Sequence, residues 1–249
     1  MKKLLGLLVF LLAPFAAADE LHVAAAISLK EPLEAVAKSY EAKTGTHIDL
    51  SLGASGTLET QILNGAPCDL FIAAADKQVD DLIAKKAADA GTRHLIATNA
   101  IVLVVPAGKT EPKSFEALGD DAVKKIAAGE PRTVPAGDYA KQIFESLKLT
   151  DTVKPKLVLG ANVRQVLDYV KRGEVDAGLV YRSDAIAAAK EVTVVATADA
   201  SWSKPINYPA VIPSTATHAA EAKAFAEYLL SDAGQAELAK AGFSPKEKK

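Results

Sequence analysis

The feature that most constrains the fold is a regular alternation of short apolar runs with longer amphipathic segments. The run "LHVAAA" (21–26) is typical of a buried strand, and "LKEPLEAVAKSYEAKTG" (29–45) of a helix with its apolar residues on one face. Pro32 falls in the first turn of that helix, where proline is tolerated, and Gly45 ends it. Such alternation predicts parallel strands with helices on both faces of a sheet.

The alternation continues in two series. The first series adds strands at 47–52 and 69–74 and helices at 57–65 and 76–86. The second series has strands at 100–106, 156–160, 176–181 and 206–212, and helices at 116–127, 139–147, 163–171 and 219–241. Because no Gly/Ser-rich linker divides the series, the pattern favours two lobes that share a close interface. The pattern alone does not indicate whether the C-terminal segment returns to the first lobe.

The first eighteen residues have the pattern of a secretory signal peptide. Basic "MKK" precedes the apolar run "LLGLLVFLLAPF", and "AAA" supplies small residues for cleavage near Ala18. That run is too short to span a bilayer. We therefore expect a secreted protein, although a buried helix or a membrane anchor is the alternative for this segment.

The charge and the cysteine content argue against nucleic-acid binding and against an intrachain disulfide. Without Lys2 and Lys3, 27 basic and 31 acidic residues remain, a net charge of −4. Lysine and arginine do not cluster among aromatic residues, so nucleic acid is not an expected partner. The single cysteine, Cys68, excludes an intrachain disulfide and is interpreted as a small buried hydrophobic residue.

Four turns between a strand and a helix share small residues. They are "AAAISLKE" with Ser28, "GASGT" with Ser55, "VPAGDYAK" with Ala136, and "LGANVR", in which Asn162 is the expected N-cap and Val163 the first helical residue. Each turn places unpaired backbone N–H groups at a helix N-terminus, where anions bind readily. Ligands dock at the carboxyl ends of strands in doubly wound folds, so the four turns are predicted to meet in one cleft.

Each of these residues also has a purely structural interpretation. Ser28 and Glu31 form an S-x-x-E pattern, the signature of a helix capping box. Ser55 fits a serine turn as well as a ligand donor. Tyr181, at the end of a buried strand, fits a core aromatic residue whose hydroxyl is satisfied locally.

Taken in order, these stretches resemble the periplasmic molybdate-binding proteins of bacterial ABC transporters. The matching stretches are "VAAAISL", "GASGTLETQILNGAPCDLFIAA", "VPAGDYAK", "VRQVLDYVKRGEVDAGLVYRSDA" and "NYPAVI". The resemblance implies a type II periplasmic binding protein, an α/β fold of two lobes. Each lobe would have a mainly parallel sheet flanked by helices, with the ligand in the cleft between them. By the same analogy, lobe 1 holds residues 19–99 plus 207–249 and lobe 2 holds residues 100–206.

The resemblance also implies the contacts to the ligand. Hydroxyl and N–H groups would come from Ser28 and Ser55, backbone N–H groups from Ala136 and Val163, and a phenol from Tyr181. Molybdenum would be bound only as the oxyanion through these residues, with no further cofactor. The sequence departs from the family pattern at Ile27, at Gly56 and at Cys68, none of which removes an assigned contact. Arg164, next to Val163, is either an exposed helix charge or a group supporting the site.

The resemblance implies molybdate as the ligand, with tungstate nearly equivalent. A pocket of neutral donors suits fully deprotonated oxyanions, whereas phosphate near neutral pH carries a proton that needs an acceptor. Sulfate, thiosulfate or a metal chelate are the alternative ligands. A secreted hydrolase is the alternative class, but His22, His47, His94 and His218 are scattered, and nucleophile-elbow and Walker motifs are absent from the sequence. The expected partners are a membrane ABC permease and its cytoplasmic ATPase, with the protein a periplasmic monomer.

Overall fold

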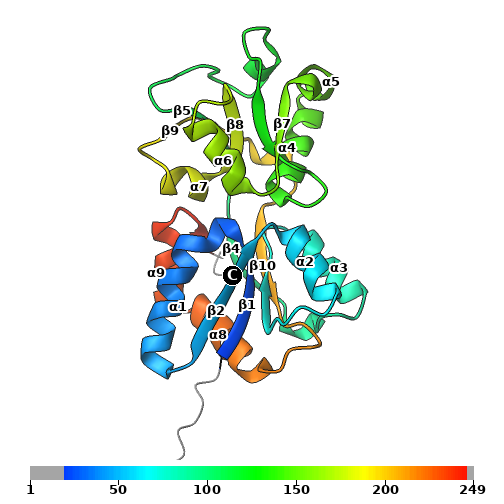
Figure 1. The fold of residues 1–249 in the computed structure, drawn as a ribbon, viewed down its shortest axis with the longest axis vertical. Helices are drawn as coiled ribbons and strands as arrows, with labels where there is room; N and C mark the ends of the chain where they lie inside the picture. Colours follow the sequence, from blue (N-terminus) through cyan, green and yellow to red (C-terminus); the bar gives the residue numbers. More distant parts are fainter. Residues whose placement is uncertain (1–19, 246–249) are drawn as a thin grey trace, which may run out of the picture.

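The computed structural model describes residues 20–245, so the expected signal peptide lies outside the described residues. Figure 1 shows two lobes, one above the other, joined by two crossing segments. We name the lobes by their sheets: lobe 1 contains the six-stranded sheet and lobe 2 the five-stranded sheet. Together with the comparisons below, this confirms the predicted two-lobed α/β fold.

Lobe 1 is built from the two ends of the described chain. Its sheet has the order β11-β4-β10-β3-β1-β2. The strands are β1 (Glu20–Ala26), β2 (His47–Gly53), β3 (Leu70–Ile72), β4 (His94–Thr98), β10 (Asn207–Val211) and β11 (Ser244–Pro245). The helices are α1 (Lys30–Thr44), α2 (Ser55–Leu63), α3 (Asp76–Ala84), α8 (Ala219–Leu230) and α9 (Asp232–Lys240), with short 3-10 turns η1 (Ile27–Leu29) and η2 (Ala90–Thr92).

Lobe 2 is built from the middle of the chain. Its sheet has the order β7-β6-β8-β5-β9. The strands are β5 (Ile101–Pro106), β6 (Ile126–Gly129), β7 (Leu157–Gly160), β8 (Ala177–Tyr181) and β9 (Val192–Thr197). The helices are α4 (Pro135–Ser146), α5 (Thr150–Val153), α6 (Val163–Lys171) and α7 (Arg182–Ala187), with 3-10 turns η3 (Glu116–Gly119), η4 (Lys154–Lys156) and η5 (Ala200–Trp202).

Both sheets are mixed, which refines the expectation of mainly parallel sheets. Strands β1, β2 and β3 are parallel to one another, as are β6, β7 and β8. Strand β4 carries the chain toward lobe 2 and β10 brings it back, so these neighbours are antiparallel. For the same reason β5, which enters lobe 2, is antiparallel to β9, which leaves it. The crossing of the chain between lobes therefore sets the mixed topology.

Two predicted helices differ from the structure. Residues 116–127 form the turn η3 and then strand β6, whose four residues are all buried. The alanines of β6 favour a helix locally, but pairing with β7 and β8 on both sides overrides that preference. The predicted helix 219–241 is interrupted at Ser231, whose side chain caps α9 by accepting the N–H of Gly234. Strands β4 and β9, which the predicted series omitted, complete the sheets.

Other boundaries follow the sequence closely. Helix α6 begins and ends at the predicted residues, with Val163, Val166, Leu167 and Val170 buried on one face. Gly45 ends α1 with φ of 79°, in the left-handed region that favours glycine. Helices α2 and α4 begin earlier than expected, at Ser55 and Pro135. Within residues 20–245, no helix has the length and apolar character needed to span a bilayer.

Candidate functional site

The four small-residue turns meet in one pocket between the lobes. Ser28 lies in η1 after β1, and Ser55 is the first residue of α2 after β2. Ala136 and Val163 lie at the N-termini of α4 and α6, and Tyr181 ends β8. The pocket is small and is lined by Ala26, Ile27, Ser28, Gly53, Ala54, Ser55, Ala74, Val134, Pro135, Ala136, Val163 and Tyr181. All five residues expected to contact a ligand therefore line the same pocket.

Parallel strand registers bring the turns together. In lobe 1, Ala26 at the end of β1 is paired with Gly53 at the end of β2, so the two serine turns leave the sheet side by side. In lobe 2, Gly129 of β6 is paired with Gly160 of β7, and the turns toward α4 and α6 follow. The pocket thus lies at the carboxyl ends of parallel strands in both lobes, the usual ligand position in open α/β sheets.

The Ser55 hydroxyl accepts one hydrogen bond from within the protein. Its Oγ accepts the backbone N–H of Ala74 at 3.0 Å, and the residue is 1 % exposed. Because a hydroxyl carries a single proton and this bond uses a lone pair, the Ser55 proton remains available for donation. The structural role and the donor role are compatible.

Ser28 does not form the predicted capping box. Turn η1 occupies residues 27–29, so α1 starts at Lys30 with Leu29 as its N-cap and without a side-chain cap. The Ser28 Oγ instead lies 2.9 Å from the Tyr208 hydroxyl, and Glu31 pairs with Arg164. The short 3-10 turn rotates Ser28 away from the cap position and toward the pocket.

Backbone N–H groups come from two helix N-termini in lobe 2. Asn162 is the N-cap of α6, as predicted, and its Oδ1 accepts the N–H of Gln165 at 3.0 Å. Val163 and Ala136 occupy the first and second positions of their helices, where intrahelical partners are lacking. In the described part of the chain neither N–H donates to another protein group. Both are therefore free to donate into the pocket.

Tyr181 contributes a neutral phenol. Its hydroxyl donates a long hydrogen bond of 3.4 Å to the carbonyl of Ala74, on the opposite lobe. Burial raises the pKa of Tyr181 well above its ordinary value of 10, so the group stays protonated. Its ring packs edge-on against Tyr208 with centroids 5.7 Å apart. The core role and a ligand role thus both remain open to this residue.

Arg164 is paired with carboxylates from both lobes. Its Nη1 and Nη2 donate to Oε1 and Oε2 of Glu31 at 2.7 and 2.5 Å, and Nε forms an ion pair with Oδ1 of Asp184 at 2.8 Å. The arginine side chain is 19 % exposed and Asp184 is fully buried. The alternative of a solvent-exposed helix charge is therefore wrong. Burial outweighs the attraction of Arg164 and raises the pKa of Asp184 to about 6.

The described residues that line the pocket carry no charged side chain. Positive potential comes instead from the N-termini of α2, α4 and α6, each with roughly half an elementary charge. Across residues 20–245, no group of three or more His, Cys, Asp or Glu side chains could hold a metal ion. Such a pocket can hold an anion through neutral donors, but it offers no nucleophile–base pair.

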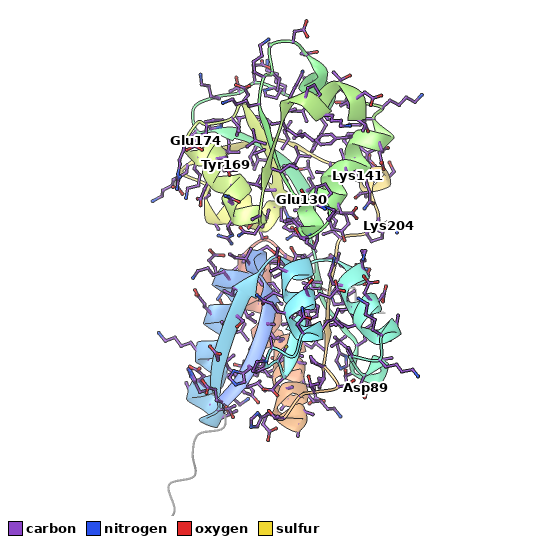
Figure 2. The ribbon with its side chains drawn as sticks, turned by 45° about the vertical axis from the view of Figure 1, so that its right-hand side comes forward. Asp89, Glu130, Lys141, Tyr169, Glu174 and Lys204 are labelled. Atoms are coloured by element: carbon purple, nitrogen blue, oxygen red, sulfur yellow. The ribbon has the colours of Figure 1, made fainter. Side chains whose placement is uncertain are left out.

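Three contributors to the site were missed in the sequence. Tyr208 bonds Ser28 from behind the pocket, Asn99 donates to Tyr208, and the carbonyl of Thr133 accepts the N–H of Gly56 across the lobes at 3.0 Å. Tyr208 lies in the "NYPAVI" motif, but its partner is 180 residues away. Figure 2 shows Glu130, three residues before Thr133, on the side of lobe 2 that faces lobe 1, whereas Asp89 lies far from this junction.

Cys68 is buried, as expected, at 4 % exposure. Burial raises the pKa of its thiol to about 12, so the reactive thiolate is suppressed at neutral pH. The residue packs in the apolar cluster around Phe71, away from the pocket.

Comparison with known proteins assigns the chain to a family. The sequence model of the family described as bacterial extracellular solute-binding protein matches residues 21–244. The chain belongs to this family. The pocket between the two lobes gives this family member a place where a solute can bind.

Relatives of this solute-binding protein include proteins named for the binding of molybdate. A putative ABC transporter substrate-binding lipoprotein, YvgL of Bacillus subtilis, is 44% identical over 232 residues, covering 90% of this chain and 86% of the relative. The molybdate-binding protein ModA of Escherichia coli is 37% identical, covering 88% of each chain. A periplasmic molybdate-binding protein from Azotobacter vinelandii has a TM-score of 0.83 and 26% identity, covering 91% of this chain and 100% of that structure.

Proposed function

We propose that this protein captures molybdate, and also tungstate, and delivers the bound oxyanion to an ABC importer. The observation that carries the proposal is the single pocket in which Ser28, Ser55, Ala136, Val163 and Tyr181 come together. The names of the relatives at 37% and 26% identity, both molybdate-binding proteins, support the choice of ligand. The first relative above, a substrate-binding lipoprotein of an ABC transporter, supports the role in import.

The chemistry of the pocket favours a fully deprotonated oxyanion. Two serine hydroxyls, the phenol of Tyr181 and N–H groups at helix N-termini are all donors. Each hydrogen bond to a charged group stabilises binding by about 1.5–3 kcal/mol net. Hydrogen phosphate would bring a proton that needs an acceptor, and the lining residues offer no carboxylate for it. We therefore expect discrimination by protonation state.

Binding would proceed by closure of the lobes about the two crossing segments. In this proposal lobe 1 comprises residues 19–99 plus 207–249 and lobe 2 comprises residues 100–206. Ser28 and Ser55 contact the ligand from lobe 1, and Ala136, Val163 and Tyr181 from lobe 2, so the ligand stabilises the closed form. The closed monomer would then dock on a membrane permease driven by a cytoplasmic ATPase. The mature protein would act in the periplasm after cleavage near Ala18.

Titration calorimetry of the mature protein with four anions tests the proposal. We expect tight binding of molybdate and tungstate, weaker or no binding of sulfate, and almost no heat with phosphate at neutral pH. Tight phosphate binding, or the absence of heat with molybdate, would contradict the proposal. Tight sulfate or thiosulfate binding without molybdate binding would support the alternative carrier instead.

We further propose that the protein is not an enzyme. The donors of the pocket hold a ligand but include no activated nucleophile, and the four histidines line none of it. Incubation with chromogenic carboxylic and phosphate esters should give no release above the buffer rate. Turnover that disappears on substitution of Ser55 by alanine would support a hydrolase.

A further inference from the structure

A pair of buried hydroxyl groups lies behind the pocket. Ser28 lines the pocket, and its Oγ is 2.9 Å from the hydroxyl of Tyr208 in β10. Tyr208 is fully buried and is not among the lining residues. The Tyr208 hydroxyl therefore reaches the pocket lining through its hydrogen bond to Ser28, whereas the Tyr208 ring packs against Tyr181.

A third residue connects this pair to a crossing between the lobes. Asn99 lies in the segment between β4 and β5, and its side-chain Oδ1 accepts the N–H of Ala100 at 2.9 Å. Its Nδ2 donates to the Oγ of Ser183 in lobe 2 at 3.0 Å and to the hydroxyl of Tyr208 in lobe 1 at 3.5 Å. The two protons of one amide group thus bond both lobes.

The chemistry of the three groups sets the donor and acceptor of each hydrogen bond from Asn99 through Tyr208 to Ser28. An amide NH₂ donates and does not accept, so the Tyr208 oxygen accepts from Asn99. Burial raises the pKa of Tyr208 well above its ordinary value of 10, so the phenol keeps its proton. The hydrogen-bond partner at 2.9 Å that can accept that proton is the Ser28 Oγ. Ser28 then accepts from Tyr208 and directs its own proton elsewhere.

We propose that Tyr208 and Asn99 are positioning residues, and that the Asn99–Tyr208–Ser28 hydrogen-bond chain directs the Ser28 proton into the pocket toward an oxyanion. The proposal rests on the proposed function, because it assigns the chain a role in anion binding. Since Asn99 bonds Ser183 of lobe 2 through the same amide, the orientation of Ser28 depends on the lobes being together. The crossing segment would therefore contribute to affinity as well as to motion.

A double-mutant cycle with molybdate as the probe tests the role of Tyr208. Ser28→Ala should weaken binding by about 10- to 100-fold, the loss of one hydrogen bond to a charged ligand. Tyr208→Phe should weaken binding about three- to tenfold in the native background, because Ser28 loses the group that orients it. In the Ser28→Ala background, Tyr208→Phe should change the Kd less than about twofold, since the residue through which it acts is gone.

The chain supplies a matched control. Ser39 on α1 and Tyr228 on α8 form a second serine–tyrosine hydroxyl pair at 2.8 Å, and neither residue lines the pocket. Ser39→Ala and Tyr228→Phe, alone or together, should leave the molybdate Kd within about twofold of the wild type. Circular dichroism and melting temperature of each ligand-free variant check that the fold is retained.

An Asn99→Asp variant tests the direction of the chain. The new carboxylate keeps the acceptor that bonds the Ala100 N–H but removes both donors. Tyr208 would then donate toward position 99, and Ser28 would have to donate to Tyr208 instead of to the ligand. We expect a loss of affinity of about tenfold or more. In the Tyr208→Phe background this reversal is impossible. The loss of molybdate affinity caused by Asn99→Asp should therefore be smaller there and should come only from the added negative charge.

The outcomes separate the two proposals. A wild-type protein that does not bind molybdate overturns the proposed function, and one that binds none of molybdate, tungstate and sulfate overturns the positioning role with it. A wild-type protein that binds molybdate, with equal effects of Tyr208→Phe in both Ser28 backgrounds, overturns the positioning role alone. Equal effects of Asn99→Asp with and without the Tyr208 hydroxyl would also overturn it.

Discussion

At the scale of single residues, the pocket uses hydroxyl groups that serve the protein and remain able to serve a ligand. Ser55 accepts from Ala74, and Ser28 lies within hydrogen-bonding distance of Tyr208. Each contact fixes the position of the serine oxygen, so the hydroxyl proton can point in only a few directions. Such preorganisation reduces the entropy that binding would otherwise cost.

Tyr181→Phe tests the phenol of the pocket. We expect molybdate affinity to fall by about 10- to 100-fold, because one donor to a charged ligand is lost. The melting temperature without ligand should change little, since the hydrogen bond from the hydroxyl to the Ala74 carbonyl is long, at 3.4 Å. Calorimetry and thermal denaturation measure both. An unchanged Kd would mean that the phenol serves the core alone.

Asp184 gives the stability of the protein a specific pH dependence. Its pKa is raised from the ordinary 3.8 to about 6 by burial, so the folded state binds this proton more tightly than the unfolded state. Its contribution therefore makes the free energy of unfolding decrease as pH rises from about 4 to about 6. Denaturant titrations across that range should show this decrease in the wild type relative to Asp184→Asn. Parallel pH profiles would contradict it.

Sequence patterns and the family resemblance indicated the pocket residues better than the hydrogen-bond partners of those residues. The five pocket residues stand at strand ends and helix starts, which short motifs reveal. Tyr208 and Asn99 carry no such local signal, because their roles depend on contacts with residues far away in the sequence. The S-x-x-E pattern at Ser28 misled for the same reason, since Glu31 is held by Arg164 of the other lobe.

At the scale of elements, two glycines allow backbones to approach closely and differ in what they approach. A Cβ on Gly137 of α4 would lie 2.1 Å from the carbonyl oxygen of Gly129, within lobe 2. A Cβ on Gly56 of α2 would lie 2.8 Å from the carbonyl oxygen of Thr133, on the opposite lobe. The approach of Gly137 to Gly129 is therefore part of the packing inside lobe 2. The approach of Gly56 to Thr133 is part of the contact between the two lobes.

Alanine substitutions should separate these two effects. Gly137→Ala should lower the melting temperature with or without ligand, because the clash lies inside lobe 2. Gly56→Ala should leave the ligand-free melting temperature nearly unchanged and weaken molybdate binding about tenfold, if closure costs roughly 1–2 kcal/mol more. Thermal denaturation and calorimetry on both variants check the contrast. A large loss of ligand-free stability in Gly56→Ala would contradict the assignment.

Elements were predictable where local pattern and tertiary packing agree. Helix α6 has an N-cap, one apolar face and polar residues opposite, so its bounds follow from the sequence. Strand β6 is four buried residues between two neighbours, and only those neighbours make it a strand. Strand β11 is two residues long and is defined by its pairing with β4.

At the scale of the whole molecule, ion pairs and hydrogen bonds join the lobes around the pocket. Glu31 of α1 pairs with Arg164 of α6, and Arg182 of α7 donates to the carbonyl of Gly242 at 2.9 Å and to the hydroxyl of Ser244 at 2.9 Å. In Figure 2, Lys204 lies beside the junction, where its backbone N–H donates to Gln142 of α4 at 2.9 Å and holds the crossing segment against lobe 2. Contacts that form only on closure add to ligand affinity.

Glu31→Gln tests the contact between α1 and α6. We expect molybdate affinity to fall about two- to fivefold, because the carboxylate is half-exposed and such pairs stabilise by at most about 1 kcal/mol. The effect should shrink at high salt. Glu34→Gln, on the same helix, removes a partner of Lys30 within lobe 1 and should leave the Kd unchanged. Equal effects of both variants would contradict a role for Glu31 in closure.

The two-lobed plan was predictable from the two series of strands and helices. The return of the chain was expected from the family resemblance alone, because nothing local in residues 207–211 indicates which sheet they join. Pairing of β10 with both β3 and β4 decides it, through contacts that span more than a hundred residues.

The central position of β10 has a consequence for the order of folding. Strands β3 and β4 have no direct pairing with each other, and β10 lies between them. During synthesis, the edges of β3 and β4 that pair with β10 therefore stay unpaired until about a hundred further residues have been made. Exposed strand edges promote aggregation. The strands of the lobe 2 sheet all come from one continuous stretch of the chain, so lobe 2 can assemble first. The chain begins with lobe 1 and yet completes it last.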